Sequence, residues 1–265
     1  MTIKTQTKNE SSAPTGSLNR AAILLTAIAR GSSKGSLLTE LVARTGLPRP
    51  TIHRVMDALM EMGWVERDPQ TTRFNLGPDF AALGYSAISR HPIERVAATE
   101  LSALAERLDQ LVYLGIRSSL DMVCIGRYES ESQIQVGRGR VGLRGPFGMS
   151  PACVAMFSRL PRDEVEAIIQ ANLSRYHRIE GFDESGFRRA VDDAMKSGYG
   201  TYDNIVLDRT TSGLGVPICD ASGYPVAAIG TTYITGWLNE DQRAQCLHEL
   251  RQAAARIAAR LMTRG

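Results

Sequence analysis

The first third of the chain holds three short amphipathic segments separated by glycines, and no other feature constrains the fold as strongly. Apolar residues recur at helical spacing over residues 18–30, 37–44 and 48–62. Ser36 precedes the second segment as its expected N-cap, and Gly46 stands in the tight turn before the third. Two helices joined by a short turn with glycine predict a helix-turn-helix.

The third segment begins with polar and basic side chains. In a helix-turn-helix the second helix enters the major groove of DNA and leads with its N-terminal residues. Arginine can bind guanine or a phosphate, threonine can bind a phosphate or a base edge, and the first helical turn adds its own N–H groups. The side chains of this segment expected to contact DNA are Arg49, Thr51, His53 and Arg54.

Residues 64–67 and 72–76 are strand-like and flank a turn, which predicts a two-stranded wing. The side chains expected to face the DNA backbone or the minor groove are Arg67, Thr71, Thr72 and Arg73. The alternative interpretation is a helical bundle with a hairpin and no role in DNA binding.

The distribution of charge favours the DNA interpretation. Residues 1–90 hold 11 Lys and Arg against 7 Asp and Glu, a net +4, whereas residues 91–265 hold 20 against 21, a net −1. The basic excess therefore lies in the part with the helix-turn-helix. It indicates an anionic partner, nucleic acid before membrane.

Five runs in this part are similar to a known family: Asn19-Arg20-Ala21 with Leu24-Leu25, Thr45-Gly46-Leu47-Pro48, Thr51-Ile52-His53-Arg54-Val55-Met56, Gly63-Trp64-Val65-Glu66-Arg67, and Phe74-Asn75-Leu76-Gly77. They resemble the N-terminal domain of IclR-type bacterial transcription regulators. The resemblance implies double-stranded DNA as a partner, and we add Arg20 and Thr45 from the matching runs to the expected DNA contacts. Pro50 departs from the Ser that is common in the family.

Length and composition exclude several classes of protein. A chain of 265 residues with 43% hydrophobic and 22% charged residues predicts a globular protein of two domains. Apolar stretches are too short to span a bilayer, and the polar N-terminus predicts a loose tail, not a signal peptide. The four cysteines form no CxxC pair, which favours reduced thiols in a cytoplasm. The four histidines have no i, i+4 pairing, so no metal site and no cofactor are expected.

The remaining two-thirds alternate strand-like runs with helical patterns and predict an α+β domain, a central sheet with segregated helices. Helices are expected at 79–90, 93–110, 161–171, 184–195 and 239–262, and strands at 111–116, 122–127, 133–136, 214–219 and 225–233. The expected domains are a disordered tail at 1–16, a winged helix-turn-helix at 17–77, a linker helix at 78–91, and an effector-binding and oligomerisation domain at 92–265.

Three stretches carry a resemblance to the GAF-like effector domain of the same family: Val123–Ser130, Lys196–Gly200, and Val216–Gly223 with Val226–Ile229. The resemblance implies that the linker helix helps to pair two subunits, although its apolar stripe could instead pack on its own chain. It also implies a ligand pocket, and the residues at the matching positions are Met149, Ala152, Cys153, Asp203, Ser212, Thr231 and Thr232. Each of these residues also has an ordinary interpretation as core or loop.

Two motifs resemble catalytic or nucleotide-binding features. The run from Gly137 to Gly142 has the spacing GxGxxG, but no helix follows it, so a dinucleotide site is disfavoured. The run contains Arg138 and Arg140, and Arg144 follows it. These arginines either close over an anionic ligand or are solvated. Cys153 has no histidine nearby in sequence and is interpreted as a buried structural thiol. No GxSxG motif occurs and no catalytic residue is assigned.

These observations predict a ligand-responsive transcription regulator. The winged helix would bind a palindromic operator, and the C-terminal domain would bind a small organic acid, with aromatic acids among the candidates. Pairing by symmetry matches two half-sites, so a homodimer or homotetramer is expected, with no membrane partner. The alternatives are an enzyme or sensor with a catalytic GAF-like domain, in which the winged helix serves protein contacts.

Overall fold

The computed structural model describes residues 16–32, 34–89, 93–131, 136–137, 139–201 and 210–263. The expected tail up to residue 15, Arg138, Asp203 and most of the strand expected at 133–136 lie outside these ranges. The chain divides into two compact units, Met1–Arg90 and His91–Gly265, and each is described by itself. No helix in the described ranges is long and apolar enough to cross a membrane.

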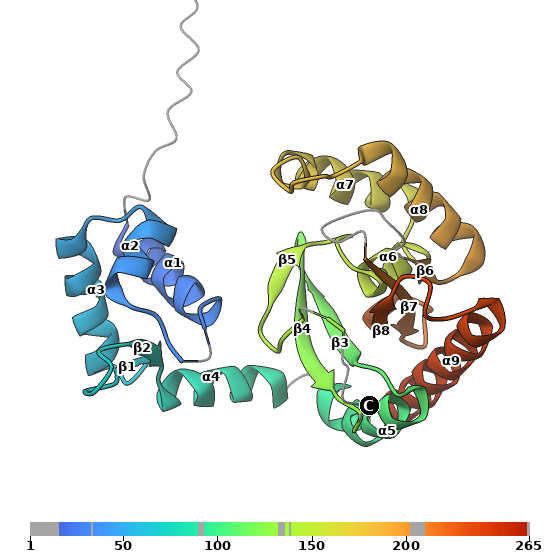
Figure 1. The fold of residues 1–265 in the computed structure, drawn as a ribbon, viewed down its shortest axis with the longest axis horizontal. Coiled ribbons are helices and arrows are strands. Elements are labelled where there is room, and N and C mark those ends of the chain that lie inside the picture. The colour runs from blue at the N-terminus through green and yellow to red at the C-terminus, as the bar shows by residue number, and fades with distance from the viewer. Residues whose placement is uncertain are drawn as a thin grey trace, which may run out of the picture. The chain divides into compact units, whose positions relative to one another are not determined.

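The first unit is a winged helix-turn-helix (Figure 1). Its elements in chain order are α1 (Ser17–Ala29), α2 (Leu38–Thr45), α3 (Arg49–Glu61), β1 (Val65–Arg67), β2 (Phe74–Leu76) and α4 (Pro78–Ser89). The helices and the wing share one core, in which Leu24, Leu41 and Ile52 are fully buried. Gly46 has φ 67°, the left-handed conformation that ends α2 and turns the chain into α3.

The expected N-cap of α2 is wrong by one residue. Leu37 occupies the N-cap position, and its N–H donates to the Glu40 carboxylate at 3.1 Å. The backbone of Ser36 instead pairs with that of Phe74 through two N–H···O bonds of 2.9 Å. Ser36 is recruited to the edge of the wing because β2 offers unpaired backbone groups there.

The linker helix is joined to the first unit at its N-terminal end. Pro78 is the first helical residue of α4, as proline's fixed φ allows. Phe80 packs edge-on against Trp64, with ring centroids 5.7 Å apart. Residues 81–86 are all exposed although several are apolar, among them Leu83 and Tyr85.

The second unit is built on one antiparallel sheet of order β5-β4-β3-β8-β7-β6. Its strands are β3 (Val112–Ser118), β4 (Asp121–Tyr128), β5 (Arg144–Pro146), β6 (Gly200–Thr201), β7 (Thr211–Cys219) and β8 (Pro225–Ile234). Its helices are α5 (Ile93–Leu108), α6 (Pro151–Phe157), α7 (Arg162–Tyr176), α8 (Glu184–Ser197) and α9 (Glu240–Met262). β5 was not expected from the sequence, and Val136 is not part of a strand.

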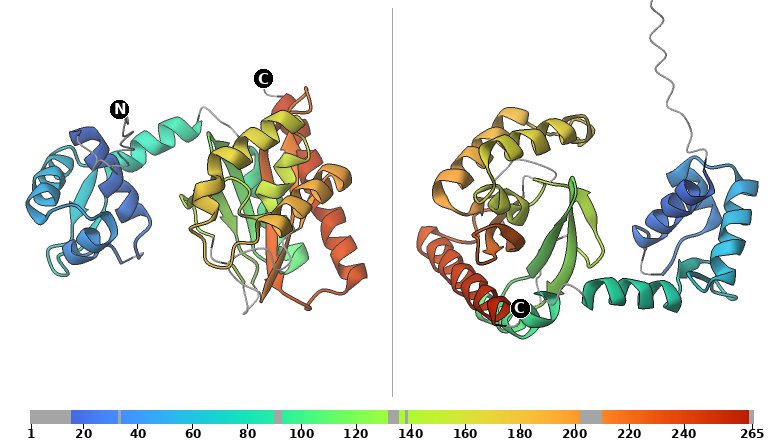
Figure 2. Two further views of the ribbon diagram at one scale, coloured as in Figure 1. Left: turned by 90° about the horizontal axis from the view of Figure 1, so that it is seen from above. Right: turned by 180° about the vertical axis from the view of Figure 1, so that it is seen from behind.

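Each face of this sheet has its own helical layer and core (Figures 1 and 2). Helices α5 and α9 cover one face, where Leu101, Leu214 and Leu250 are buried together. Helices α6, α7 and α8 cover the other, where Phe147, Phe157 and Phe187 are buried. We call these the α5/α9 face and the α6 face.

Glycines bring α6 into direct contact with the sheet. A Cβ at Gly215 would lie 2.5 Å from the backbone nitrogen of Ala152, and one at Gly200 would lie 2.6 Å from that of Ala155. No larger side chain fits at these positions unless α6 moves away. The glycines of β6 and β7 therefore set the distance between α6 and the sheet.

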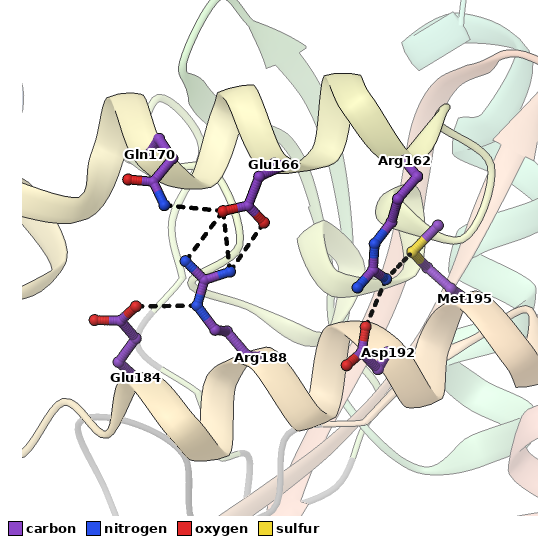
Figure 3. Close-up of polar contacts among 7 residues, drawn as sticks. All are labelled: Arg162, Glu166, Gln170, Glu184, Arg188, Asp192 and Met195. Atoms are coloured by element: carbon purple, nitrogen blue, oxygen red, sulfur yellow. Dashed lines mark hydrogen bonds and ion pairs between the residues drawn. The ribbon is translucent and has the colours of Figure 1, made fainter.

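Ion pairs hold the outer helices together (Figure 3). The Arg188 guanidinium of α8 donates to both carboxylate oxygens of Glu166 on α7 and to Glu184 at the start of α8. Farther along, Arg162 donates to Asp192 at 2.5 Å. These charges are partly exposed, so their main effect is to align the two helices.

Candidate DNA-binding surface and effector site

The outward side of α3 carries the basic side chains expected to contact DNA. Ile52, Met56 and Leu59 anchor the helix in the core of the first unit. Arg54 is exposed on the opposite side, and Arg49 is exposed at the first position of the helix; within the described part of the chain neither forms an ion pair or a side-chain hydrogen bond. His53 is exposed with them, and Thr51 is half-buried. Their polar groups are therefore available to a partner.

Other residues of the expected DNA-binding set are already engaged within the unit. Arg73 donates to the Gly35 carbonyl at 2.9 Å and lies 3.6 Å from the Glu40 carboxylate. The Thr45 hydroxyl donates to the Leu41 carbonyl at 2.7 Å and thereby closes the end of α2. Both contacts stabilise the fold, and a role of these side chains in DNA binding would have to compete with them.

The remaining members of that set lie on α1 and on the wing. Arg20 is half-buried on α1. Arg67 is exposed, with its guanidinium carbon 5.4 Å from the centre of the Phe74 ring. Thr71 and Thr72 are exposed at the tip of the wing, and Thr72 has φ 57°. The tip is shaped by Asp68, whose pKa is lowered by hydrogen bonds from the Thr71 and Gln70 backbone N–H groups.

The structure separates the expected effector residues onto the two faces of the sheet. Neighbouring residues of a strand point to opposite faces. On β8, Thr232 lies opposite Gly213 on the α6 face, next to Pro151 at the start of α6. Thr231 points to the α5/α9 face, where its hydroxyl donates to Gln110 at 3.0 Å. The two threonines therefore cannot line the same pocket.

Ser212 lies on the α5/α9 face as well. It pairs with Tyr233 across the β7–β8 ladder and forms a hydroxyl–hydroxyl bond of 3.0 Å with Thr235. Its neighbour Gly213 takes the α6-facing position instead. The structure therefore places Ser212 and Ala152 on different faces of the sheet, because the strand's two-residue period decides the face.

Three expected residues come together on the α6 side with Thr232. Ala152 and Cys153 are buried in the first turn of α6, and Met149 is half-buried just before it. Burial raises the pKa of the Cys153 thiol, and the Ser150 hydroxyl donates to its sulfur at 3.1 Å. A neutral, packed thiol fits the expected structural role better than a nucleophile.

Polar residues on β3 and β4 that were not predicted from the sequence share this face. Tyr113 and Arg127 are cross-strand partners, and both lie on the side of the sheet that α6 covers. The half-buried Tyr113 has a pKa raised by burial, which outweighs the lowering by the neighbouring positive charge of Arg127. Cys124 follows on the same side, where burial raises its pKa to about 11. Alternation along residues 112–118 and 121–128 is the signal that could have found them.

The glycine-rich run lies against this group. A Cβ at Gly139 would lie 2.5 Å from the Tyr113 ring, and the Thr232 hydroxyl donates to the Val136 carbonyl at 2.6 Å. Arg140 is half-buried in the run, and Arg144 forms an ion pair with Asp121. Among the described residues, no group of three or more His, Cys, Asp or Glu could hold a metal ion.

Comparisons with known proteins agree with this architecture. Residues 17–69 match the model of the IclR helix-turn-helix domain, and residues 85–259 match that of the bacterial transcriptional regulator IclR C-terminal domain. The chain belongs to the IclR family of DNA-binding transcription regulators. The matches confirm the family, the α+β fold and the regulatory function predicted from the sequence, and favour a regulator over an enzyme.

Relatives cover most of the chain. The HTH-type transcriptional regulator KipR of Bacillus subtilis is 26% identical over 225 residues, 84% of this chain and 89% of KipR. KdgR of Escherichia coli is 21% identical over 88% of each protein. An IclR regulator structure from Alicyclobacillus acidocaldarius has a TM-score of 0.75 at 22% identity, covering 92% of this chain and 97% of its own. An IclR homologue from Microbacterium hydrocarbonoxydans, complexed with 4-hydroxybenzoate, has a TM-score of 0.74 at 20% identity, covering 94% and 100%.

Proposed function

We propose that this regulator binds a pseudo-palindromic operator with the outward side of α3 in the major groove and the wing on the flanking backbone. The observation that carries the proposal is the pair of exposed arginines, Arg49 and Arg54, which have no partner within the described part of the chain. His53, Thr51 and Arg67 extend the same surface. Arg20, Thr45 and Arg73 remain in the proposed set, but Thr45 and Arg73 would contact DNA only by giving up their contacts within the unit. Guanidinium groups without an internal partner keep their full hydrogen-bonding capacity for phosphates and guanine edges.

A gel-shift titration of the full-length protein on the DNA upstream of its own gene tests this proposal. Specific binding should weaken steeply as salt rises, because phosphate contacts release counterions. A shuffled fragment of equal length is the control. Equal affinity for both fragments, or binding that salt does not change, would contradict it.

The proposed effector is a small organic acid, with a benzoate-like acid as the leading candidate because one relative of the same fold is complexed with 4-hydroxybenzoate. The proposed site is the α6 face. We assign it Met149, Ala152, Cys153 and Thr232, retain Asp203, which lies outside the described residues, and add Tyr113 and Arg127. Ser212 and Thr231 are left out because they point to the other face.

Thermal-shift assays with 4-hydroxybenzoate and related acids test the site, since a ligand that binds only the folded state must raise the melting temperature. Thr232→Leu should remove the shift by filling the α6 face. Ser212→Ala, on the other face, should keep it. If Ser212→Ala removes the shift and Thr232→Leu does not, the pocket lies on the α5/α9 side.

We also propose that the regulator acts as a homodimer or homotetramer in the cytoplasm. Two symmetric subunits double the contacts to a palindromic site. The exposed apolar side chains of α4, such as Leu83, offer a surface for pairing. The effector would act by binding the DNA-competent arrangement and the incompetent one with different affinities.

A further inference from the structure

A cavity of about 410 Å³ lies in the second unit, where the β7–β8 turn meets the end of α9. It opens where the central strands β3 and β8 stop pairing: their ladder ends at Gly115 and Ala228, although β3 continues to Ser118 and β8 begins at Pro225. Unpaired strand ends leave a space that is lined by Ile116 of β3 and Val226 of β8.

Two helix ends complete the walls. Helices α5 and α9 pack antiparallel, as the contact of Glu100 with Arg256 indicates, so the start of α5 lies beside the end of α9 (Figure 1). Ile93 and Leu261 contribute apolar side chains from these ends, and Ala221 lines the cavity from the β7–β8 turn.

The polar groups that line the cavity are satisfied by the protein itself. Arg117 forms an ion pair with Glu164 and donates from Nε to the Ser119 carbonyl at 3.0 Å. Asp220 accepts from the Ser222 hydroxyl at 2.6 Å and the Tyr224 N–H at 3.0 Å. A charged ligand would lose hydration here without gaining a counter-charge, whereas an apolar one gains from burial.

The size favours a small molecule over a protein partner. Its volume falls in the range of small-molecule pockets, roughly 300–1,000 Å³. A stable protein interface needs about 800 Å² from each partner. The large apolar side chains exposed around the opening are few: Tyr224, Val226 and Met262.

We propose that this cavity binds one uncharged aromatic or branched aliphatic molecule, at a site separate from the organic-acid site on the α6 face. Its walls share no residue with the proposed acid site. Ile93 is the first helical residue of α5, so an occupant would contact the start of that helix. The regulator would then have a second input of different chemistry.

Isothermal titration of the full-length protein with indole tests the proposal, with benzoate as the charged counterpart. Indole should bind saturably, and benzoate should not displace it. Ala221→Phe, at an exposed turn position, and Val226→Phe should each fill the cavity and weaken indole binding at least tenfold. Ala244→Phe adds the same ring at an exposed position of α9 away from the cavity, and indole binding should be unchanged.

Three results would overturn the proposal. The first is that the wild type shows no saturable indole binding. The second is that Ala221→Phe and Val226→Phe both bind indole as tightly as the wild type does. The third is that benzoate displaces indole. Sedimentation velocity tests the other possible occupant of the cavity, which is a second copy of the chain. If Ala221→Phe dissociates the assembly, that copy and not a small molecule covers the cavity; an unchanged sedimentation coefficient agrees with the proposal.

Discussion

Arginines of the first unit differ in what their guanidinium groups contact, and this difference predicts what their loss would do. Arg49 and Arg54 are exposed and unpaired within the described residues, whereas Arg73 donates to Gly35 and lies beside Glu40. Arg49→Ala or Arg54→Ala should weaken operator binding by about 1–3 kcal/mol if the side chain reads a base. Their urea midpoints should stay at the wild-type value.

Arg73→Ala is the matched control for this prediction. It should lower the urea midpoint, because the Gly35 carbonyl and Glu40 lose a charged partner. Fluorescence anisotropy on the operator and urea unfolding of the same preparations separate the two effects. Unchanged DNA affinity for both α3 variants would mean that another element reads the operator.

Glu100 gives a pH-dependent prediction. Its burial raises the carboxyl pKa, but hydrogen bonds and charge from Arg256 and Arg107 outweigh this, so the pKa lies below its ordinary value. A lowered pKa stabilises the folded state above the unfolded-state pKa of about 4.3, and this contribution disappears as pH falls through the folded-state value. Glu100→Gln should therefore be less stable than wild type at pH 7, by roughly 1.5–3 kcal/mol.

Urea unfolding at several pH values between 7 and 3 checks this prediction. The difference in unfolding free energy should shrink as the wild-type carboxylate becomes protonated. A difference that stays constant down to pH 3 would show that the loss comes from packing and not from charge.

At the scale of elements, α6 depends on the glycines beneath it. Gly215→Ala would place a methyl group 2.5 Å from the Ala152 backbone nitrogen. Backbone atoms cannot rotate away, so the fold should lose about 1–3 kcal/mol of stability, and the effector response should weaken because α6 shifts. Gly145→Ala in β5 is the control, since its Cβ would meet nothing within 4 Å. Equal stability of the two variants would contradict close packing of α6.

Long helices with a repeating apolar pattern could be predicted from the sequence. Short strands that form only by pairing with a neighbouring strand could not. The helices now seen as α3, α5, α8 and α9 follow from apolar residues at helical spacing over 13 to 23 residues. The three residues of β5 carry no strand pattern and form a strand because the edge of β4 accepts them. Ser36 pairs with β2 for the same reason. Such short strands form only where a neighbouring strand leaves its edge unpaired, and the local sequence carries no information about that strand.

At the scale of the whole molecule, we expect the proposed self-association to determine how tightly the regulator binds DNA. One recognition helix makes few base contacts, and a symmetric pair doubles them. Sedimentation velocity should give a dimer or tetramer at micromolar concentration. Leu83→Glu, a charge on the exposed side of α4, should shift the protein towards monomers and reduce operator affinity. Ala81→Glu adds the same charge at an exposed position on the other side of α4 and tests whether charge alone is responsible.

The sequence by itself determined the helix-turn-helix, the wing, the basic character of the first unit and the family, because helical periodicity and glycine turns are local properties. It also led us to expect the effector-binding part in the larger, near-neutral remainder. Only the tertiary structure decided which face of each strand α6 covers. A shift of one residue exchanges the faces, so Thr231 and Ser212 turned away from α6, and Tyr113 and Arg127 joined Thr232 there.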